Sequence, residues 1–108
     1  MTLSLFPAIV TYFEVSNGQD ATRLADCFTT DAVVRDEGHT HRGHDAIQAW
    51  MAGTRKAFEY SVTPSAATQE GRRVSVVAEV IGNFPGSPVQ LEHRFLMAGD
   101  RIKSLEIG

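Results

Sequence analysis

Two histidines at alternate positions, His39 and His41, follow Asp36 closely and form a group in this sequence that could support chemistry. On a β-strand, alternate side chains point to the same side, so both imidazoles would share a face near the carboxylate. Such a set is part of a metal site at most, because structural zinc uses four ligands and catalytic zinc three, and the spacing fixes no further ligand. We therefore predict no metal and no cofactor. The two histidines are expected either to line a pocket or to lie on a solvated hairpin.

Cys27 is the only cysteine of the 108 residues, which excludes an internal disulfide and a cysteine-based zinc site. It falls in an apolar helical pattern, so we interpret it as a small buried core residue and not as a nucleophile. A lone cysteine fits a reducing cytoplasm, where we expect the protein to reside. No stretch approaches the ~20 apolar residues needed to cross a bilayer, so no membrane partner is expected.

The charge composition argues against a nucleic-acid partner. Ten basic residues stand against thirteen acidic ones, so no strongly basic face is predicted. The adjacent pair Arg72-Arg73 follows Gly71 and is more typical of a solvated turn than of a phosphate-binding patch.

The elements that would position these residues begin with helices and a hairpin. The spacing of apolar residues predicts a helix from about Ser4 to Val15, and Asp20 is suited to cap a second helix. Strand-like stretches at 31–35 and 39–42 predict a short hairpin, and a third helix is expected over 44–57.

A change of the apolar period to two residues predicts that a sheet begins at about Tyr60. The strands that follow are separated by turns at Glu70-Gly71, at 85–88 and at Gly99-Asp100. Helices followed by a meandering sheet indicate the α+β class.

The predicted strand from Val74 to Phe84 is apolar on both faces, with Val74 and Val76 on one side and Val77 and Ile81 on the other. One face can cover the helices, but the other would need a second protein surface. We therefore expect a homodimer through the outer face of the sheet. The alternative is a monomer with scattered surface valines.

A set of short motifs in the first half of the chain has the order found in a known superfamily. The motifs are Tyr12-Phe13, Asn17-Gly18, Asp20, Leu24, Phe28, Asp31-Ala32-Val33-Val34, Asp36 and Gly43-x-x-Ala46-Ile47. They resemble the nuclear transport factor 2-like superfamily, in particular its ketosteroid isomerase and SnoaL-like polyketide cyclase branches. The stretches 36–41 and 83–88 resemble a subgroup of short bacterial members. The resemblance implies a cone-shaped α+β fold, with three N-terminal helices on a curved antiparallel or mixed sheet, and a single SnoaL-like domain over residues 1–108.

The resemblance also implies a set of catalytic residues. In ketosteroid isomerases an aspartate moves a proton on carbon, while a tyrosine and a protonated acid hydrogen-bond the developing enolate. Matched by spacing, Asp36 takes the place of the base and Tyr12 that of the tyrosine. Counted back from the last strand, Glu92 falls at or near the acid, where an inward-facing carboxyl would stay neutral.

Several of these assignments have a plain structural alternative. Tyr12 would also fit as a buried core ring, and Asp36 as a turn former. Arg94 lies two residues beyond Glu92 and would keep its carboxyl ionised if the two pair. Met51 stands where the isomerases carry a second tyrosine, so a relay behind Tyr12 is not expected.

A pocket in this fold would be lined by aromatic and polar side chains, which are otherwise core or surface residues. The predicted ligand-binding residues are Phe28, His39, His41, Trp50, Phe58, Phe84 and Arg94.

The sequence thus predicts a protein with a pocket for a small hydrophobic molecule. The first hypothesis is an acid–base isomerase, cyclase or dehydratase that acts on a small apolar carbonyl compound. A second is a non-catalytic binder of a hydrophobic ligand, and a third is a protein-interaction module that uses the sheet surface. The scaffold hosts all three kinds of function.

Overall fold

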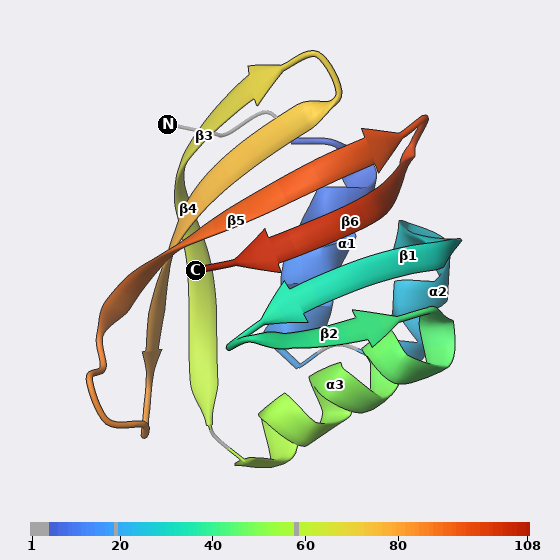
Figure 1. Ribbon diagram of the computed structural model, residues 1–108. Coiled ribbons are helices and arrows are strands. Elements are labelled where there is room, and N and C mark those ends of the chain that lie inside the picture. The colour runs from blue at the N-terminus through green and yellow to red at the C-terminus, as the bar shows by residue number, and fades with distance from the viewer. Residues whose placement is uncertain (1–4, 19, 58) are drawn as a thin grey trace.

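The computed structural model describes residues 5–18, 20–57 and 59–108, and within these ranges it contains three α-helices and one six-stranded sheet. Figure 1 shows the helices on one side of a strongly curved, open sheet. The predicted α+β architecture, with helices packed on a curved mixed sheet, is confirmed. The helices are α1 (Pro7–Ser16), α2 (Leu24–Cys27) and α3 (His44–Ala57). The strands are β1 (Phe28–Asp36), β2 (His39–Arg42), β3 (Tyr60–Glu70), β4 (Arg73–Gly82), β5 (Val89–Ala98) and β6 (Arg101–Ile107).

The first helix begins at Pro7, whose fixed φ and missing N–H suit the first turn. It ends before Asn17, and Gly18 follows with a φ of 108° that favours glycine. The predicted start at Ser4 lies outside the described residues.

The second predicted helix is shorter than its apolar spacing suggested. Asp20 accepts a hydrogen bond from the Thr22 backbone N–H (3.0 Å) and starts a 3-10 turn over Ala21–Arg23, which continues into α2. The predicted helix stops at Cys27 because Phe28 and the β-branched residues after it enter β1. Cys27 is buried in the core as predicted, and burial raises the pKa of its thiol to about 11.

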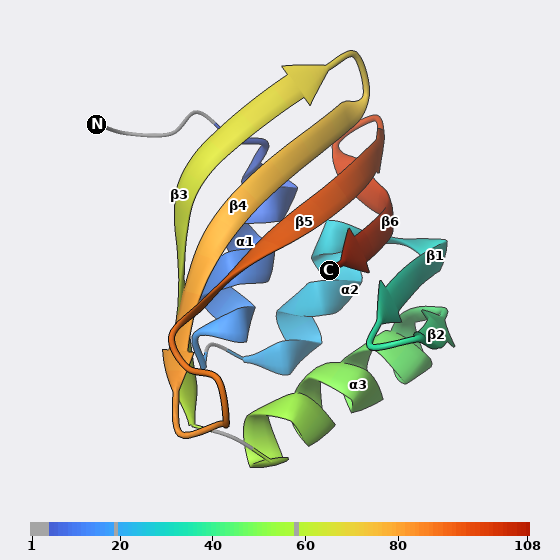
Figure 2. The same cartoon turned by 60° about the vertical axis from the view of Figure 1, so that its left-hand side comes forward.

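The strands lie in the order β2-β1-β6-β5-β4-β3, with β1 and β6 parallel and all other neighbours antiparallel. Figure 2 shows α1 and α2 within the curve of this sheet and α3 along its lower end. The inner residues of β4, which include Val74 and Val76, are buried beneath the helices as predicted. Ile81 on the opposite face is 49% exposed.

Two polar side chains fasten the helices to the edge strand β3. The amide of Asn17 accepts from the Val62 N–H (2.6 Å) and donates to the Val62 carbonyl (2.8 Å), like an additional strand residue. Arg55 on α3 donates to the carbonyls of Ser16 (2.7 Å) and Tyr60 (3.1 Å), so it joins α1, α3 and β3. These contacts keep the ends of α1 and α3 at a fixed distance from the sheet.

None of the helices in the described part of the chain has the length and apolar character needed to cross a membrane.

Candidate active site

A cavity of about 810 Å³ lies between α1, α3 and the inner face of the sheet. Helices α1 and α3 supply one wall, the end of β1 and the start of β2 supply a second, and strands β3 to β5 supply the third. The predicted site residues that line it are Tyr12, Asp36, His39, His41, Trp50 and Phe84.

Asp36 is the last residue of β1, where its half-buried side chain reaches the cavity. The indole Nε1–H of Trp50 donates a hydrogen bond to the Asp36 Oδ2 (3.2 Å). This bond fixes the carboxylate, and the side-chain hydrogen bonds among the described residues include none to Oδ1. Trp50 is itself held by a parallel stack on Tyr12 (ring centroids 6.5 Å apart) and by His41 (5.9 Å). The indole thus connects three predicted site residues from three different elements.

Tyr12 is only 1% exposed and packs edge-on against Phe13 and Phe95. Burial raises its pKa well above the usual range, and the nearby charges of Tyr60 and Asp36 act in the same direction. A hydrogen bond with Ser16 opposes this shift. The phenol therefore stays neutral at any ordinary pH and keeps an O–H that can donate.

The placement of Glu92 is a correction to the sequence analysis. Its side chain lies on the outer face of the sheet, where the Ser75 hydroxyl donates to Oε2 (2.6 Å) and Arg94 Nη1 contacts Oε1 (2.6 Å). The bonds to Ser75 and then Arg94 lower the pKa of this carboxyl, so it is not a neutral donor. The count from the last strand was wrong by one residue, and in a sheet one residue reverses the face.

Arg94, which was predicted to bind the ligand, lies outside the cavity for the same reason. Two residues beyond Glu92, it lies on the outer face and pairs with both Glu92 and Glu106. The predicted alternative, an ion pair between Arg94 and Glu92, is what the structure contains.

His93 is the inward residue that the sequence analysis did not assign to the active site. It is 3% exposed, lines the cavity and lies 6.1 Å from Tyr12 between ring centroids. Desolvation lowers the pKa of its imidazole. Its Nδ1 lies 3.2 Å from the Leu91 carbonyl, and because a carbonyl only accepts, Nδ1 carries the proton in the neutral ring. His93, Phe95 and Met97 occupy alternate positions of the sequence, and this spacing could have indicated that they share the inward face.

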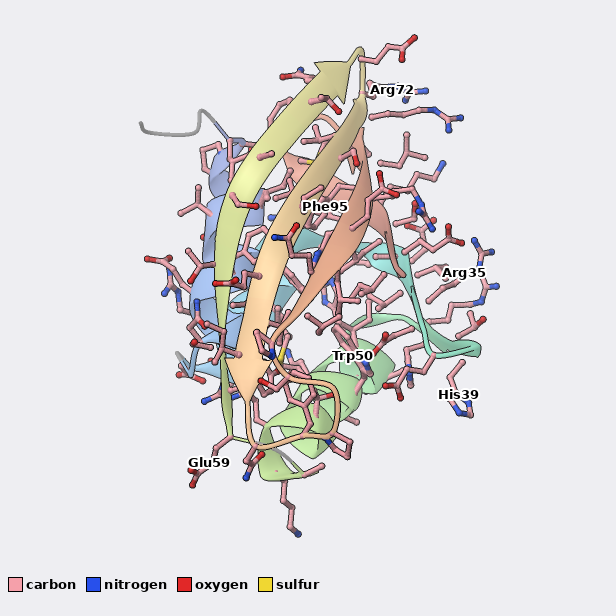
Figure 3. The ribbon with its side chains drawn as sticks, turned by 90° about the vertical axis from the view of Figure 1, so that its left-hand side faces the viewer. Arg35, His39, Trp50, Glu59, Arg72 and Phe95 are labelled. Carbon is pink, nitrogen blue, oxygen red and sulfur yellow. The ribbon has the colours of Figure 1, made fainter. Side chains whose placement is uncertain are left out.

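The remaining predicted ligand residues differ in their surroundings. Phe28 is fully buried beside Tyr12 (6.3 Å between ring centroids) and belongs to the core instead of the cavity wall. Phe28 is the first residue of β1 and lies behind α1, which explains why its ring is in the core and not in the cavity wall. Phe58 lies outside the described residues. Figure 3 shows Trp50 between α3 and the strands, whereas His39 projects away from the body at the cavity rim.

The described residues contain no group of three histidine, cysteine, aspartate or glutamate side chains that could hold a metal ion. The chemistry that the cavity can support is proton transfer. A fixed carboxylate, a neutral phenol and a neutral imidazole lie on its walls, and the rest of the lining is largely apolar.

The comparisons with known proteins agree with this architecture. The family described as the SnoaL-like domain matches residues 9–103. A protein from Sinorhizobium meliloti that has been proposed to be a polyketide cyclase is 39% identical, with a TM-score of 0.92 over 96% of this chain and 95% of the other. No functionally curated protein matches the sequence.

Two more distant structures show the same fold. A Catenulispora acidiphila protein with a ketosteroid isomerase-like fold is 21% identical, with a TM-score of 0.85 over 97% of this chain and 86% of the other. An Agrobacterium tumefaciens protein, proposed to be an isomerase of the SnoaL-like family, is 16% identical, with a TM-score of 0.77 over 93% and 92%.

Proposed function

Because this chain belongs to the family of SnoaL-like domains, within the nuclear transport factor 2-like superfamily, we propose that it catalyses acid–base chemistry on a small, mostly apolar carbonyl compound. The observation that carries the proposal is that Asp36, Tyr12 and His93 line the same cavity of about 810 Å³. The similarity to a protein proposed to be a polyketide cyclase supports the same class of reaction. Isomerisation, ring closure and dehydration all begin with the same proton transfer.

In the proposed reaction, Asp36 takes a proton from the carbon next to the substrate carbonyl. The electron pair of that C–H bond moves into the new C=C bond, and the carbonyl π electrons move onto oxygen. The Tyr12 O–H donates to this developing oxyanion. In an isomerisation, Asp36 returns the proton to another carbon. In a cyclisation, the enolate carbon attacks a second carbonyl, the π electrons of that carbonyl move onto its oxygen, and this oxygen takes the proton from Asp36. The Trp50 indole holds Oδ2 and so orients the carboxylate throughout. Because it occupies only this oxygen, Oδ1 remains to accept the proton.

His93 lines the cavity where the sequence analysis expected Glu92, but its proposed role differs from that of a neutral acid. With Nδ1–H bound to the Leu91 carbonyl, Nε2 is the nitrogen without a proton in the neutral ring, and we propose that it is a second proton acceptor. The backbone of Val76 also hydrogen-bonds the imidazole, so this role requires that contact to yield to the substrate. The lowered pKa of His93 keeps the ring in this neutral state at neutral pH.

A substrate-independent assay tests the proposal. We expect the protein to accelerate exchange of the α-protons of 2-tetralone in D₂O, followed by proton NMR. Asp36→Asn should lower the rate by a factor of about 10² to 10⁴, the usual contribution of a general base. Asp31→Asn is the matched control, because it removes the same charge from an exposed position of the same strand.

The exchange assay also separates the rival functions. Equal exchange rates for Asp36→Asn and the wild type would exclude the proposed base. Binding of 2-tetralone with no exchange would favour a non-catalytic binder, for which Met51 in the cavity wall in place of a second tyrosine is the supporting observation.

We also propose that two copies of the chain associate through the outer face of the sheet. Ile81, 49% exposed, and the half-buried Val77 give this face apolar surface, and the glutamates beside Arg94 make it self-complementary in charge. Sedimentation equilibrium should give a dimer for the wild type and a shift to monomer for Ile81→Glu. A monomeric wild type at 50 μM would exclude the dimer, and a different bound partner would favour an interaction module.

A further inference from the structure

The turn between β1 and β2 has an unfavourable residue at its first central position. Asp36 and His39 are paired, so the turn consists of Glu37 and Gly38 alone. Both have positive φ, 52° and 77°. A two-residue turn of this kind prefers Asn-Gly, because asparagine tolerates the left-handed region far better than glutamate. Glu37 is the only non-glycine residue with positive φ in the described part of the chain.

Glu37 is an exposed residue of the lining of the inner cavity, and it follows Asp36 directly. Among the described residues, no ion pair and no side-chain hydrogen bond includes Glu37. The ion pairs and side-chain hydrogen bonds of the described residues thus include none from this carboxylate that offsets the unfavourable turn position. Unfavourable backbone positions are often kept at functional sites, and the cavity that Glu37 lines is the candidate.

The cavity has an uneven charge. Asp36 and Glu37 are the acidic residues of its described lining, which includes no lysine and no arginine. The neighbouring Arg55 is occupied elsewhere, since its guanidinium donates to two carbonyls and lies over the Tyr60 ring at 4.9 Å. Desolvation lowers the pKa of His93 in the lining, so this imidazole is neutral at pH 8. The described lining therefore has two acidic residues on one side and no lysine or arginine to offset them.

We propose that Glu37 sets the charge preference of the cavity, so that neutral and amine-bearing ligands enter and carboxylates or phosphates are rejected. This inference rests on the proposed function to the extent that the cavity must bind a small molecule. It narrows the substrate to carbonyl compounds that arrive uncharged or with an amine, and not as an ester of a phosphorylated carrier.

Three probes with the same ring system test the proposal: 2-naphthylmethanol, 2-naphthylmethylamine and 2-naphthoate. Their dissociation constants are measured at pH 8 and low salt by following the indole N–H signal of Trp50. For the wild type we expect 2-naphthoate to bind at least tenfold more weakly than the alcohol. Glu37→Gln should narrow this ratio about threefold to tenfold, and 0.5 M NaCl should reduce the difference between the two proteins.

Glu70→Gln is the control, because it removes an exposed carboxylate at the end of β3, outside this cavity. It should leave the ratio unchanged. Equal binding of alcohol and carboxylate by the wild type, or an unchanged ratio in Glu37→Gln, would overturn the proposal. If no probe of any charge moves the Trp50 signal, the proposed binding function itself fails, and the charge preference fails with it.

The turn gives a second readout that does not depend on a ligand. Glu37→Asn should raise Tm by about 2 to 6 °C over Glu37→Gln, because only asparagine relieves the left-handed position. Equal Tm values for the two variants would contradict the claim that the turn retains an unfavourable residue.

Discussion

The two faces of β5 use neighbouring residues in opposite ways. On the outer face, Glu92 and Arg94 are each more than 40% exposed and satisfy one another within a charged row that includes Glu106. On the inner face, His93 and Phe95 are buried, and His93 lines the cavity. Charged groups that neutralise each other have little chemistry left to offer. Under the proposed function, the part of this strand that takes part in chemistry is therefore the inner face, which has fewer charges.

Removal of an inner ring should have the largest effect on stability. Phe95→Ala deletes a 2% exposed ring that packs on Tyr12 and Phe13, so we expect a loss of about 3 to 5 kcal/mol in the free energy of unfolding. Urea denaturation measures this loss in the free energy of unfolding. The control is Leu96→Ala on the adjacent, half-buried outer position, where the loss should be clearly smaller. Equal losses would contradict the assignment of the core to the inner face.

A buried neutral imidazole should make the stability sensitive to mild acid. The pKa of His93 is lowered in the folded state, so below its ordinary value of 6.5 the unfolded chain binds more protons than the folded one. The free energy of unfolding should therefore fall as the pH decreases below about 6.5, by up to ~1.4 kcal/mol per pH unit from this group.

The corresponding measurement compares the urea midpoints of the wild type and His93→Gln from pH 7.5 to pH 5.0. The variant should be less stable at pH 7.5, but its midpoint should fall less steeply with decreasing pH. Parallel curves for the two proteins would show that His93 is not buried in its neutral form.

A change on the outer face should have the smallest effect. Glu92→Gln removes a carboxylate that is 42% exposed in its side chain and screened by solvent, so the urea midpoint should change little. The rate of 2-tetralone exchange should stay at the wild-type value, because the group does not reach the cavity. A loss of exchange activity in this variant would return Glu92 to the list of catalytic candidates.

Local patterns in the sequence predicted most of the elements correctly. The strand β4, the helix α3 and the β1–β2 hairpin follow from apolar periods and turn residues that act over a few positions. The parallel pairing of β1 with β6 could not be predicted this way, because about 70 residues separate Val34 from its partner Leu105. The length of α2 was also missed, since the strand preference of Phe28 to Thr30 overrides the helical spacing.

The candidate site shows where spacing alone is sufficient and where it is not. Tyr12 lies in the first helix and Asp36 at the end of a strand, where nearby motifs set the position of each residue, and both line the cavity. No nearby motif sets the position of Glu92. Its place was counted along β5, where a difference of one residue separates the outward Glu92 from the inward His93. The bond from Trp50 to Asp36 joins a helix to a strand 14 residues away and has no signature in the sequence.

The central claim is that Asp36, Tyr12 and His93 surround one ligand-accessible cavity, and a single NMR signal tests it directly. The chain has one tryptophan, so the indole N–H of Trp50, bound to Asp36, gives one resolved resonance in a ¹H–¹⁵N spectrum. On titration with 2-tetralone, we predict a saturable shift of this resonance in the wild type and an altered shift in Asp36→Asn. Binding of 2-tetralone that leaves the Trp50 resonance unmoved would contradict the account.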